Sequence, residues 1–498
     1  MFPKRFAVSI IAAPLPLAFA YIAYNAKYNP YLQDDTTSTT TTTPPTFATA
    51  PPTLQHHFLE RLISKLSGTW VDNIFAYGAG YGRGKLHFKT GGWGDIEIVE
   101  KCSDLLKRDA LSDRSAKDRA KDARTWVPQD QVKWEGEWTK DQEGAWYRDG
   151  SFPTPLIHLF GAEATDKMLF KPAQRCHFRY VVPSLDSPST QSELFGTTMT
   201  AITPTTGTEG IETTPTVAPT SSPLSSSTTQ GSGDMPLCIH LPCAGDQFFE
   251  WRTRHFAAPL AVKYGIASVI IEAPSYGKRR RPNRQVRGAQ IHRVADLAVG
   301  GLTQITESIG IFSLFKEHVP CHAKGNFGMC GISMGAEIAS LYTAVTPIPT
   351  HLVAVMPSHS AVATWNVGVL NEVSDWGHLA ATMPAAAGMD STATASRRTA
   401  NDARNKARAW LQHTDIRTFP LPYHWIKPKD RPNVLILGAL HDAYIPAQST
   451  WTLAEHWNET ATCRWLPGGH CTTVVLHKNT IVESIAEVFT SRILPMKR

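Results

Sequence analysis

The sequence predicts an α/β fold in which a mostly parallel sheet carries helices on both faces. Short apolar segments alternate with longer stretches of helical period in the second half of the 498-residue chain, and this alternation is typical of such a sheet. Right-handed crossovers between the strands favour an open sheet. The predicted strands are 238–241, 267–272, 327–332, 352–356, 434–437 and 463–466, and the predicted helices are 248–263, 296–318, 336–345, 449–457 and 482–493.

An apolar segment near the amino terminus predicts contact with a membrane. Within residues 1–30, the stretch 6–24 carries no charged side chain and follows a basic pair. It is about long enough to cross a bilayer as a helix, so we expect a single membrane anchor. A cleaved signal peptide remains an alternative, because the residues around Ala20 resemble a cleavage site, and an organelle presequence is a third reading.

Low-complexity composition marks further boundaries. Residues 31–53 are rich in Thr and Pro and predict a disordered stalk, and residues 184–234 predict a disordered Ser/Thr/Pro-rich insert. The strand-like segments 177–182 and 236–241 flank the insert, and we expect them to pair as a hairpin with a long loop. Two further units remain: 54–183 is the N-terminal part of the domain, and 235–498 is the core, with a lid at about 362–432.

Composition gives little support for nucleic-acid or metal binding. Charged residues make up 18% of the chain and the formal net charge is only +6, which gives little support for nucleic-acid binding. The eight cysteines are scattered without CxxC pairs, so we expect free thiols and no metal site. No pattern indicates a cofactor.

One pentapeptide indicates a catalytic nucleophile. Gly331-Ile332-Ser333-Met334-Gly335 matches G-x-S-x-G, in which glycines allow a strained turn from a strand into a helix that exposes the serine hydroxyl. A predicted strand precedes the motif and a predicted helix follows it. The setting favours an α/β-hydrolase fold with Ser333 as nucleophile.

A serine hydroxyl needs a general base and an acid that holds that base. In this fold the chain order is serine, acid, histidine. Asp442 follows the strand 434–437, and His470 follows the strand 463–466 and two glycines that let the loop fold back. We therefore expect Asp442 as supporting acid and His470 as general base. The oxyanion needs backbone N–H donors, for which we expect Met334 and, in the loop after strand 238–241, Gly245 or one of its neighbours.

Several stretches together resemble the family of α/β-hydrolase-domain-containing protein eighteen. The resembling segments are HFRYVVP (177–183), CIHLPCAGDQFFEWR (238–252), ASVIIEAPSYGKRRRP (267–282), GMCGISMG (328–335), VGVLNEVSDW (367–376), HDAYIP (441–446) and LPGGH (466–470). The resemblance implies a serine hydrolase with the triad Ser333, Asp442 and His470, acting on acyl lipids at intracellular membranes. The organelle stays open, with the mitochondrion and the endoplasmic reticulum as candidates. The oxyanion loop departs from the family at Cys243, Ala244 and Gln247, where the family has Gly, Thr and His.

The function predicted is hydrolysis of a carboxylic ester, of a lipid or phospholipid, at a membrane. The basic run Lys278-Arg279-Arg280-Arg281 follows strand 267–272, so it is expected at the active edge of the sheet. We expect Arg279, Arg280 and Arg281 to bind an anionic head group, with a solvated loop as the alternative. A generic carboxylesterase, a peptidase and a catalytically silent binding module remain competing functions.

Overall fold

The computed structural model describes residues 68–69, 71–76, 87–98, 100–104, 127–183, 235–281, 291–346, 348–383, 399–419, 421 and 431–490. The expected anchor, stalk and Ser/Thr/Pro-rich insert lie outside the described residues.

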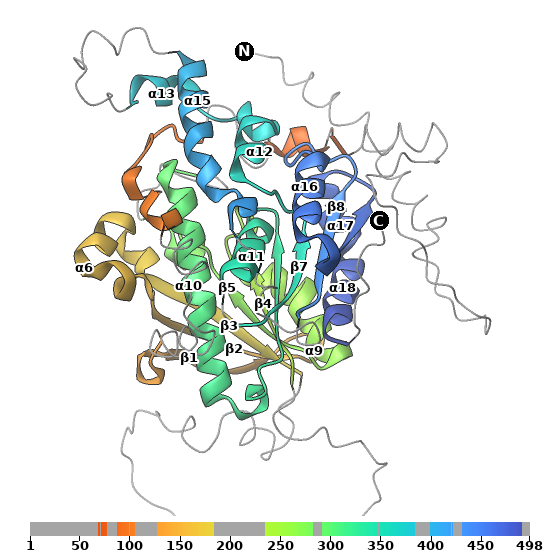
Figure 1. The fold of residues 1–498 in the computed structure, drawn as a ribbon. Helices are drawn as coiled ribbons and strands as arrows, with labels where there is room; N and C mark the ends of the chain where they lie inside the picture. The colour runs from red at the N-terminus through yellow and green to blue at the C-terminus, as the bar shows by residue number, and fades with distance from the viewer. Residues whose placement is uncertain are drawn as a thin grey trace, which may run out of the picture.

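One nine-stranded sheet, in the order β1-β2-β3-β5-β4-β6-β7-β8-β9, organises the described chain (Figure 1). From β5 through β9 in that order, neighbouring strands are parallel, and β1, β2 and β3 extend the sheet as an antiparallel edge. The mostly parallel sheet with its helices confirms the predicted α/β-hydrolase fold. The strands are β1 (Lys133–Lys140), β2 (Trp146–Pro153), β3 (Arg175–Val182), β4 (Leu237–Leu241), β5 (Ala267–Ile271), β6 (Phe327–Ile332), β7 (His351–Val355), β8 (Val434–Ala439) and β9 (Ala461–Leu466).

The predicted hairpin is wrong. The two segments that flank the insert do form strands, β3 and β4, but β5 lies between them and pairs with both. Every residue of β5 is buried, so its backbone N–H and C=O groups need partners on both sides. Strand β3 supplies an antiparallel partner and β4 a parallel one, which no local pattern in the sequence specifies.

Alternate residues of the parallel strands belong to two separate apolar cores. In β7, Leu352 and Ala354 join the cluster that contains α10, α11 and α16 residues, whereas Val353 and Val355 join the cluster that contains α9 and α18 residues. Figure 1 shows α10 and α11 in front of the sheet. Because successive side chains of a strand point to opposite faces, one strand packs on two helical layers. The α-helices are α6 (Leu156–Met168), α8 (Glu250–Arg252), α9 (Ala258–Tyr264), α10 (Ala295–His318), α11 (Met334–Val345), α12 (Ala361–Asn366), α13 (Trp376–Ala381), α15 (Ala400–Leu411), α16 (Ala447–Trp457), α17 (His470–Leu476) and α18 (Lys478–Thr490).

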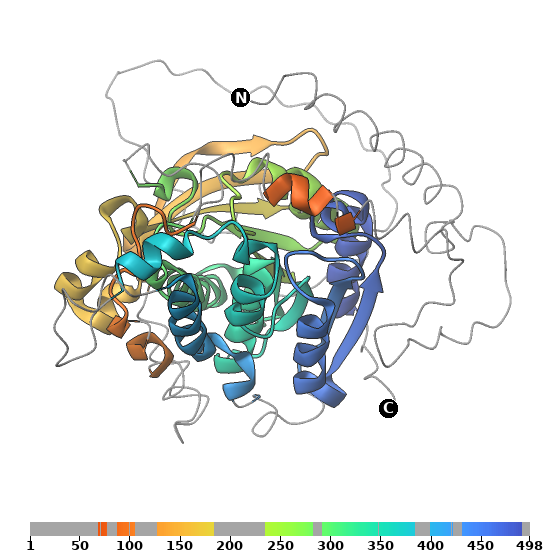
Figure 2. The same ribbon diagram turned by 90° about the horizontal axis from the view of Figure 1, so that it is seen from above.

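A third core lies beyond the end of the sheet. Helices α12, α13 and α15 interrupt the alternation of strands and helices between β7 and β8, where we expected a lid. They pack on one another and on the segment 87–98, and they lie at the top of the molecule in Figure 1 and face the viewer in Figure 2. Met334 and Tyr444 join the same cluster, so these helices cover the edge of the sheet that carries the predicted catalytic residues.

Among the described helices, α10 alone is long and apolar enough to cross a membrane by length and composition. However, 83% of its apolar window is buried, and its side chains share one apolar core with α11 and the strands. We therefore read it as the central core helix of the domain.

Candidate active site

Ser333 occupies a strained turn between β6 and α11. Its backbone has φ 56° and ψ −120°, a conformation that a residue with a Cβ atom adopts only when its surroundings impose it. The flanking glycines show what imposes it. A Cβ at Gly331 would lie 2.1 Å from the carbonyl oxygen of Gly335, and one at Gly335 would lie 2.6 Å from that of Leu241. Positions 331 and 335 therefore accept only glycine. The turn between them places the half-buried Ser333 at the end of the strand.

Asp442 and His470 form a hydrogen-bonded pair. His470 Nδ1 and Asp442 Oδ2 are 2.7 Å apart, and both side chains are nearly inaccessible to solvent. The other carboxylate oxygen of Asp442 accepts hydrogen bonds from the backbone N–H groups of Tyr444 and Ile445, each at 2.8 Å. The ring of Tyr444 stacks on the imidazole with centroids 4.8 Å apart. The two backbone N–H groups thus hold the carboxylate of Asp442, and this carboxylate in turn holds the imidazole of His470.

The electrostatic surroundings favour the protonated form of His470. Burial alone would lower the pKa of His470, but the charge and hydrogen bond of Asp442, together with the charge of Asp72, outweigh burial and raise it. An imidazolium formed during a reaction is therefore stabilised where it forms, which is the contribution a triad acid makes.

The three residues share one edge of the sheet. Ser333 follows β6, Asp442 follows β8 and His470 follows β9, and the carboxyl ends of these parallel strands lie at the same edge. Backbone hydrogen bonds from Leu440 to Leu466 and from His441 to Gly468 hold the acid loop beside the base loop. Among the described contacts, Ser333 Oγ makes no hydrogen bond to His470. The approach of hydroxyl to imidazole therefore remains a prediction, and such contacts often tighten only when substrate binds.

Residues 222–491 match the family model described as alpha/beta hydrolase domain containing 18, which is more than half of the chain. The chain belongs to the alpha/beta hydrolase domain containing 18 family. The resemblance drawn from the sequence segments is thereby confirmed.

Three of the solved structures that resemble this chain, all at low sequence identity, are esterases. An acetyl xylan esterase from Paenibacillus sp. R4 has a TM-score of 0.44 and 11% identity over 80% of this chain and 97% of its own. Acetyl xylan esterase 1 from Thermoanaerobacterium sp. has 0.40 and 13% over 76% and 98%. A cold-adapted esterase from an Arctic intertidal metagenomic library has 0.35 and 13% over 72% and 99%. Likeness at this level says nothing about the substrate of this family member.

The two predicted oxyanion donors, Met334 and Gly245, lie in different settings. Met334 is the first residue of α11, so its N–H is one of the amides that a helix leaves without an intrahelical acceptor. The backbone of Gly245, in contrast, is engaged: burial raises the pKa of Tyr276, and a hydrogen bond from the Gly245 backbone partly opposes that rise. A second oxyanion donor from this loop, Gly245 or one of its neighbours, stays a prediction. That loop is fixed by Arg252, which pairs with Asp246 at 2.6 Å.

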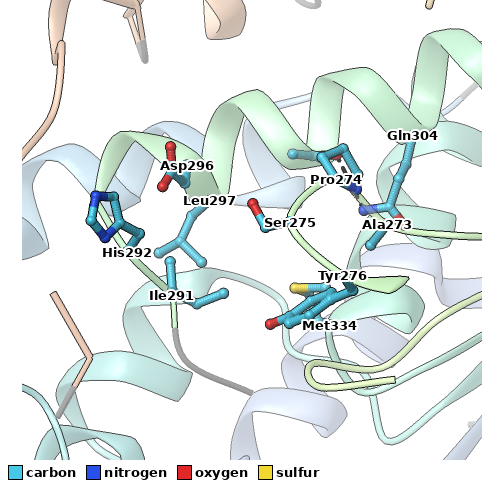
Figure 3. A pocket seen from close by; sticks show the side chains of 12 residues that line it. Ala273, Pro274, Ser275, Tyr276, Ile291, His292, Asp296, Leu297, Gln304 and Met334 are labelled. Carbon is cyan, nitrogen blue, oxygen red and sulfur yellow. Dashed lines mark hydrogen bonds between the residues drawn. The ribbon is translucent and has the colours of Figure 1, made fainter. Parts of the chain in front are cut away.

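A small hollow borders the turn that carries Ser333 (Figure 3). Met334 and Tyr276 form its floor, while Ser275 and Leu297 lie across from them and His292 and Asp296 stand at one end. Its volume is about 20 Å³, which holds about one water molecule. Two adjacent glycines of α10, Gly300 and Gly301, also line it, and a Cβ at Gly300 would meet no atom within 4 Å. The hollow therefore continues along a part of α10 that has no side chains.

The expectation that Arg279 binds a head group is wrong. Arg279 is fully buried and pairs with the equally buried Glu307, through hydrogen bonds of 2.8 and 2.7 Å. It also donates to the carbonyl oxygens of Glu272 and Ala173. A buried carboxylate needs such a partner, so this guanidinium belongs to the core. The sequence held a signal for it, because Glu307 lies in the middle of an apolar helical pattern.

The rest of the basic run is more accessible. Arg280 is exposed, and Arg281 is half-buried with its guanidinium 4.6 Å from the ring centre of Phe170. Lys278 pairs with Glu135 at 2.7 Å. Of the three predicted head-group residues, Arg280 and Arg281 are therefore the two that a ligand can reach.

Sequence reasoning missed one residue that contacts the acid and base loops. Asp72 is fully buried, and its carboxylate accepts hydrogen bonds from the backbone N–H groups of Ala443, His470 and Cys471. Nothing in its local sequence marks it, since its partners lie roughly 370 to 400 residues further along the chain and only tertiary structure brings them together.

Proposed function

We propose that this α/β hydrolase is a membrane-tethered serine hydrolase that cleaves a carboxylic ester of a lipid or phospholipid. One observation carries the proposal. A serine in a strained turn that only glycines can flank stands at the same sheet edge as a buried Asp442–His470 pair joined over 2.7 Å. Strain of this kind costs about 1–3 kcal/mol and persists mainly at functional sites.

The proposed reaction is acyl transfer through a covalent intermediate. Ser333 Oγ attacks the ester carbonyl while His470 Nε2 takes its proton, since Nδ1 is committed to Asp442. The oxyanion of the tetrahedral intermediate is stabilised by the Met334 N–H and a second amide of the loop after β4. The alcohol leaves with the proton from His470, and a water molecule activated by the same imidazole releases the acid.

Three features support a lipid over a small soluble ester. The apolar stretch 6–24 is expected to hold the enzyme at a membrane, in the mitochondrion or the endoplasmic reticulum. Helices α12, α13 and α15 cover the active edge as a lid does. Arg280 and Arg281 follow the loop that lines the hollow beside Met334, where a phosphate of a head group would find charge-assisted hydrogen bonds.

A fluorophosphonate probe tests the enzymatic proposal most directly. We expect the purified protein to be labelled and Ser333→Ala to be unlabelled. Ser340→Ala is the matched control, because its buried hydroxyl lies on the same helix and bonds only to the backbone of Ala336. Absence of labelling in the folded wild type would favour a silent binding module. Products released from a lipid extract, a short-chain ester and a peptide then separate lipase, generic carboxylesterase and peptidase.

A further inference from the structure

Asp72 joins the two loops that carry the acid and the base. Its Oδ2 accepts the N–H of His470 at 2.7 Å and that of Ala443 at 3.0 Å, and its Oδ1 accepts the N–H of Cys471 at 2.8 Å. Ala443 is the neighbour of Asp442 in the acid loop, and His470 is the proposed base itself. One buried carboxylate therefore bridges both halves of the hydrogen-bonded pair.

The two amides from the base loop explain why a carboxylate is needed there. His470 and Cys471 are the first residues of α17, and the first amides of a helix have no acceptor within it. The residue before them is Gly469, which has no side chain to accept these hydrogen bonds. Asp72 supplies that acceptor from a distant part of the chain, with a negative charge at the positive end of the helix.

The surroundings leave little room for Asp72 to move. A Cβ at Gly469 would lie 2.6 Å from Asp72 Oδ2, and a Cβ at Gly68 would lie 2.6 Å from the backbone nitrogen of Gly469. The segment of residues 68–69 and 71–76, which carries Asp72, thus packs directly against the loop of His470. The Thr69 hydroxyl donates to the carbonyl oxygen of His441, on the acid loop.

We propose that Asp72 is a positioning residue of this hydrolase, which fixes the backbone of His470 relative to Asp442 and so sets the direction of the imidazole towards Ser333. This inference rests on the proposed function. It goes beyond it by extending the active site to a segment that lies outside the matched family region 222–491. A displacement of about 1 Å at such a site costs about 10²-fold in rate.

The charges around the imidazole give this role a measurable signature. The groups that face His470 are the carboxylates of Asp442 and Asp72, the ring of Tyr444 and the adjoining Cys471. Both carboxylates raise the pKa of His470 against its burial. The pKa of Asp72 is itself raised, by burial and then by the charge of Asp442. Because the base must be neutral to act, removing the charge of Asp72 should move the acidic limb of the activity profile to lower pH.

The experiment compares Asp72→Asn, Asp72→Glu and the control Asn73→Ala with the wild type, all as full-length chains. Asn73 lies next to Asp72, and its side chain donates to the carbonyl oxygen of Thr69 in the same segment. On a short-chain ester, we expect Asp72→Asn to lower kcat by about 10²-fold with KM nearly unchanged, and to shift the acidic limb of kcat/KM downwards. Asp72→Glu keeps the charge and should leave the limb in place while kcat falls, since the longer side chain has no room. Asn73→Ala should behave as the wild type.

The outcomes separate this inference from the proposed function. An inactive wild type would remove the proposed function, whereas an active wild type with unchanged kcat and pH profile in Asp72→Asn would overturn the role of Asp72 alone. If kcat falls and the acidic limb of the pH profile does not move, Asp72 supports the structure and does not position the base. If Asp72→Asn does not fold, Asp72→Glu decides, because a wild-type kcat in that variant contradicts a fixed position of the carboxylate.

Discussion

Arg280 and Arg281 differ from Arg279 in what surrounds their guanidinium groups. Arg279 is enclosed with Glu307 in the core, while Arg280 is exposed and Arg281 lies over Phe170. Replacing Arg279 would leave Glu307 as an unpaired buried charge, which costs about 3–5 kcal/mol and would mask any effect on substrate. The head-group hypothesis is therefore tested with the other two residues.

We expect Arg280→Gln with Arg281→Gln to slow hydrolysis of an anionic phospholipid and to leave a neutral ester unaffected. Each arginine near an anionic surface contributes about 1 kcal/mol, so together they account for about 2 kcal/mol, or roughly 30-fold in kcat/KM. The exposed pair Arg254 and Lys263, replaced by Gln, is the control for net charge. Equal loss on both esters would show that these arginines do not select a charged substrate.

For single residues, the sequence predicts geometry that a local turn fixes, and it does not predict contacts with a distant partner. Ser333 is marked by the glycines around it, because the turn itself requires them. The sequence around Asp72 has no such pattern. The sequence does not distinguish Arg279 from its exposed neighbours either, because only the structure shows its contact with Glu307. Identity at one position does not encode which residue of another element will face it.

Among the elements, the loop after β5 holds a carboxylate whose ionisation opposes folding. Burial raises the pKa of Glu272 to about 7, against the opposing effects of the Lys278 backbone N–H and nearby cations. A carboxyl whose folded pKa is raised contributes stability below its unfolded pKa, and loses that contribution as pH rises through the folded pKa. The loss thus occurs between about pH 4.5 and pH 7.

Glu272→Gln should therefore become more stable relative to the wild type as pH rises from about 5 to 8. The difference between the two unfolding free energies reaches about 3 kcal/mol at most, because burial raises the pKa of Glu272 from 4.5 to about 7. Urea unfolding of both proteins at each pH measures it, and Glu163→Gln on the exposed side of α6 is the control. If the difference in unfolding free energy does not change with pH, ionisation of Glu272 does not destabilise the fold.

The elements of the parallel sheet were the easiest part of the fold to predict. Strands β4 to β9 are short, wholly or mostly buried and bounded by helical patterns, which leaves few other readings. Strands β1 and β2 were not predicted, because their side chains are mostly half-buried or exposed. The pairing of β3 with β5 was also missed, since strand order depends on tertiary packing.

On the scale of the whole molecule, the first segment that the structure describes contacts the proposed active site. Residues 68–76 begin about 15 residues after the predicted stalk ends at residue 53, and they contact both loops of the Asp442–His470 pair. Under these proposals, the stalk and residues 54–67 lie in the chain between the membrane anchor and the segment that positions the base. Because the two segments are separate in the chain, truncation at residue 30 or at residue 76 tests the anchor and the positioning segment one at a time.

Removing residues 1–30 should move the protein to the soluble fraction and preserve its activity on a short-chain ester, because only the anchor is lost. Removing residues 1–76 should abolish that activity, since Asp72 and the hydrogen bonds it accepts from His470, Cys471 and Ala443 are lost as well. Fractionation, circular dichroism and the ester assay check both proteins. Membrane association that survives the shorter truncation would show a second lipid-binding surface, and an amino terminus beginning after Ala20 in the wild type would show cleavage instead of anchoring. A folded, fully active 77–498 fragment would contradict the role of the 68–76 segment.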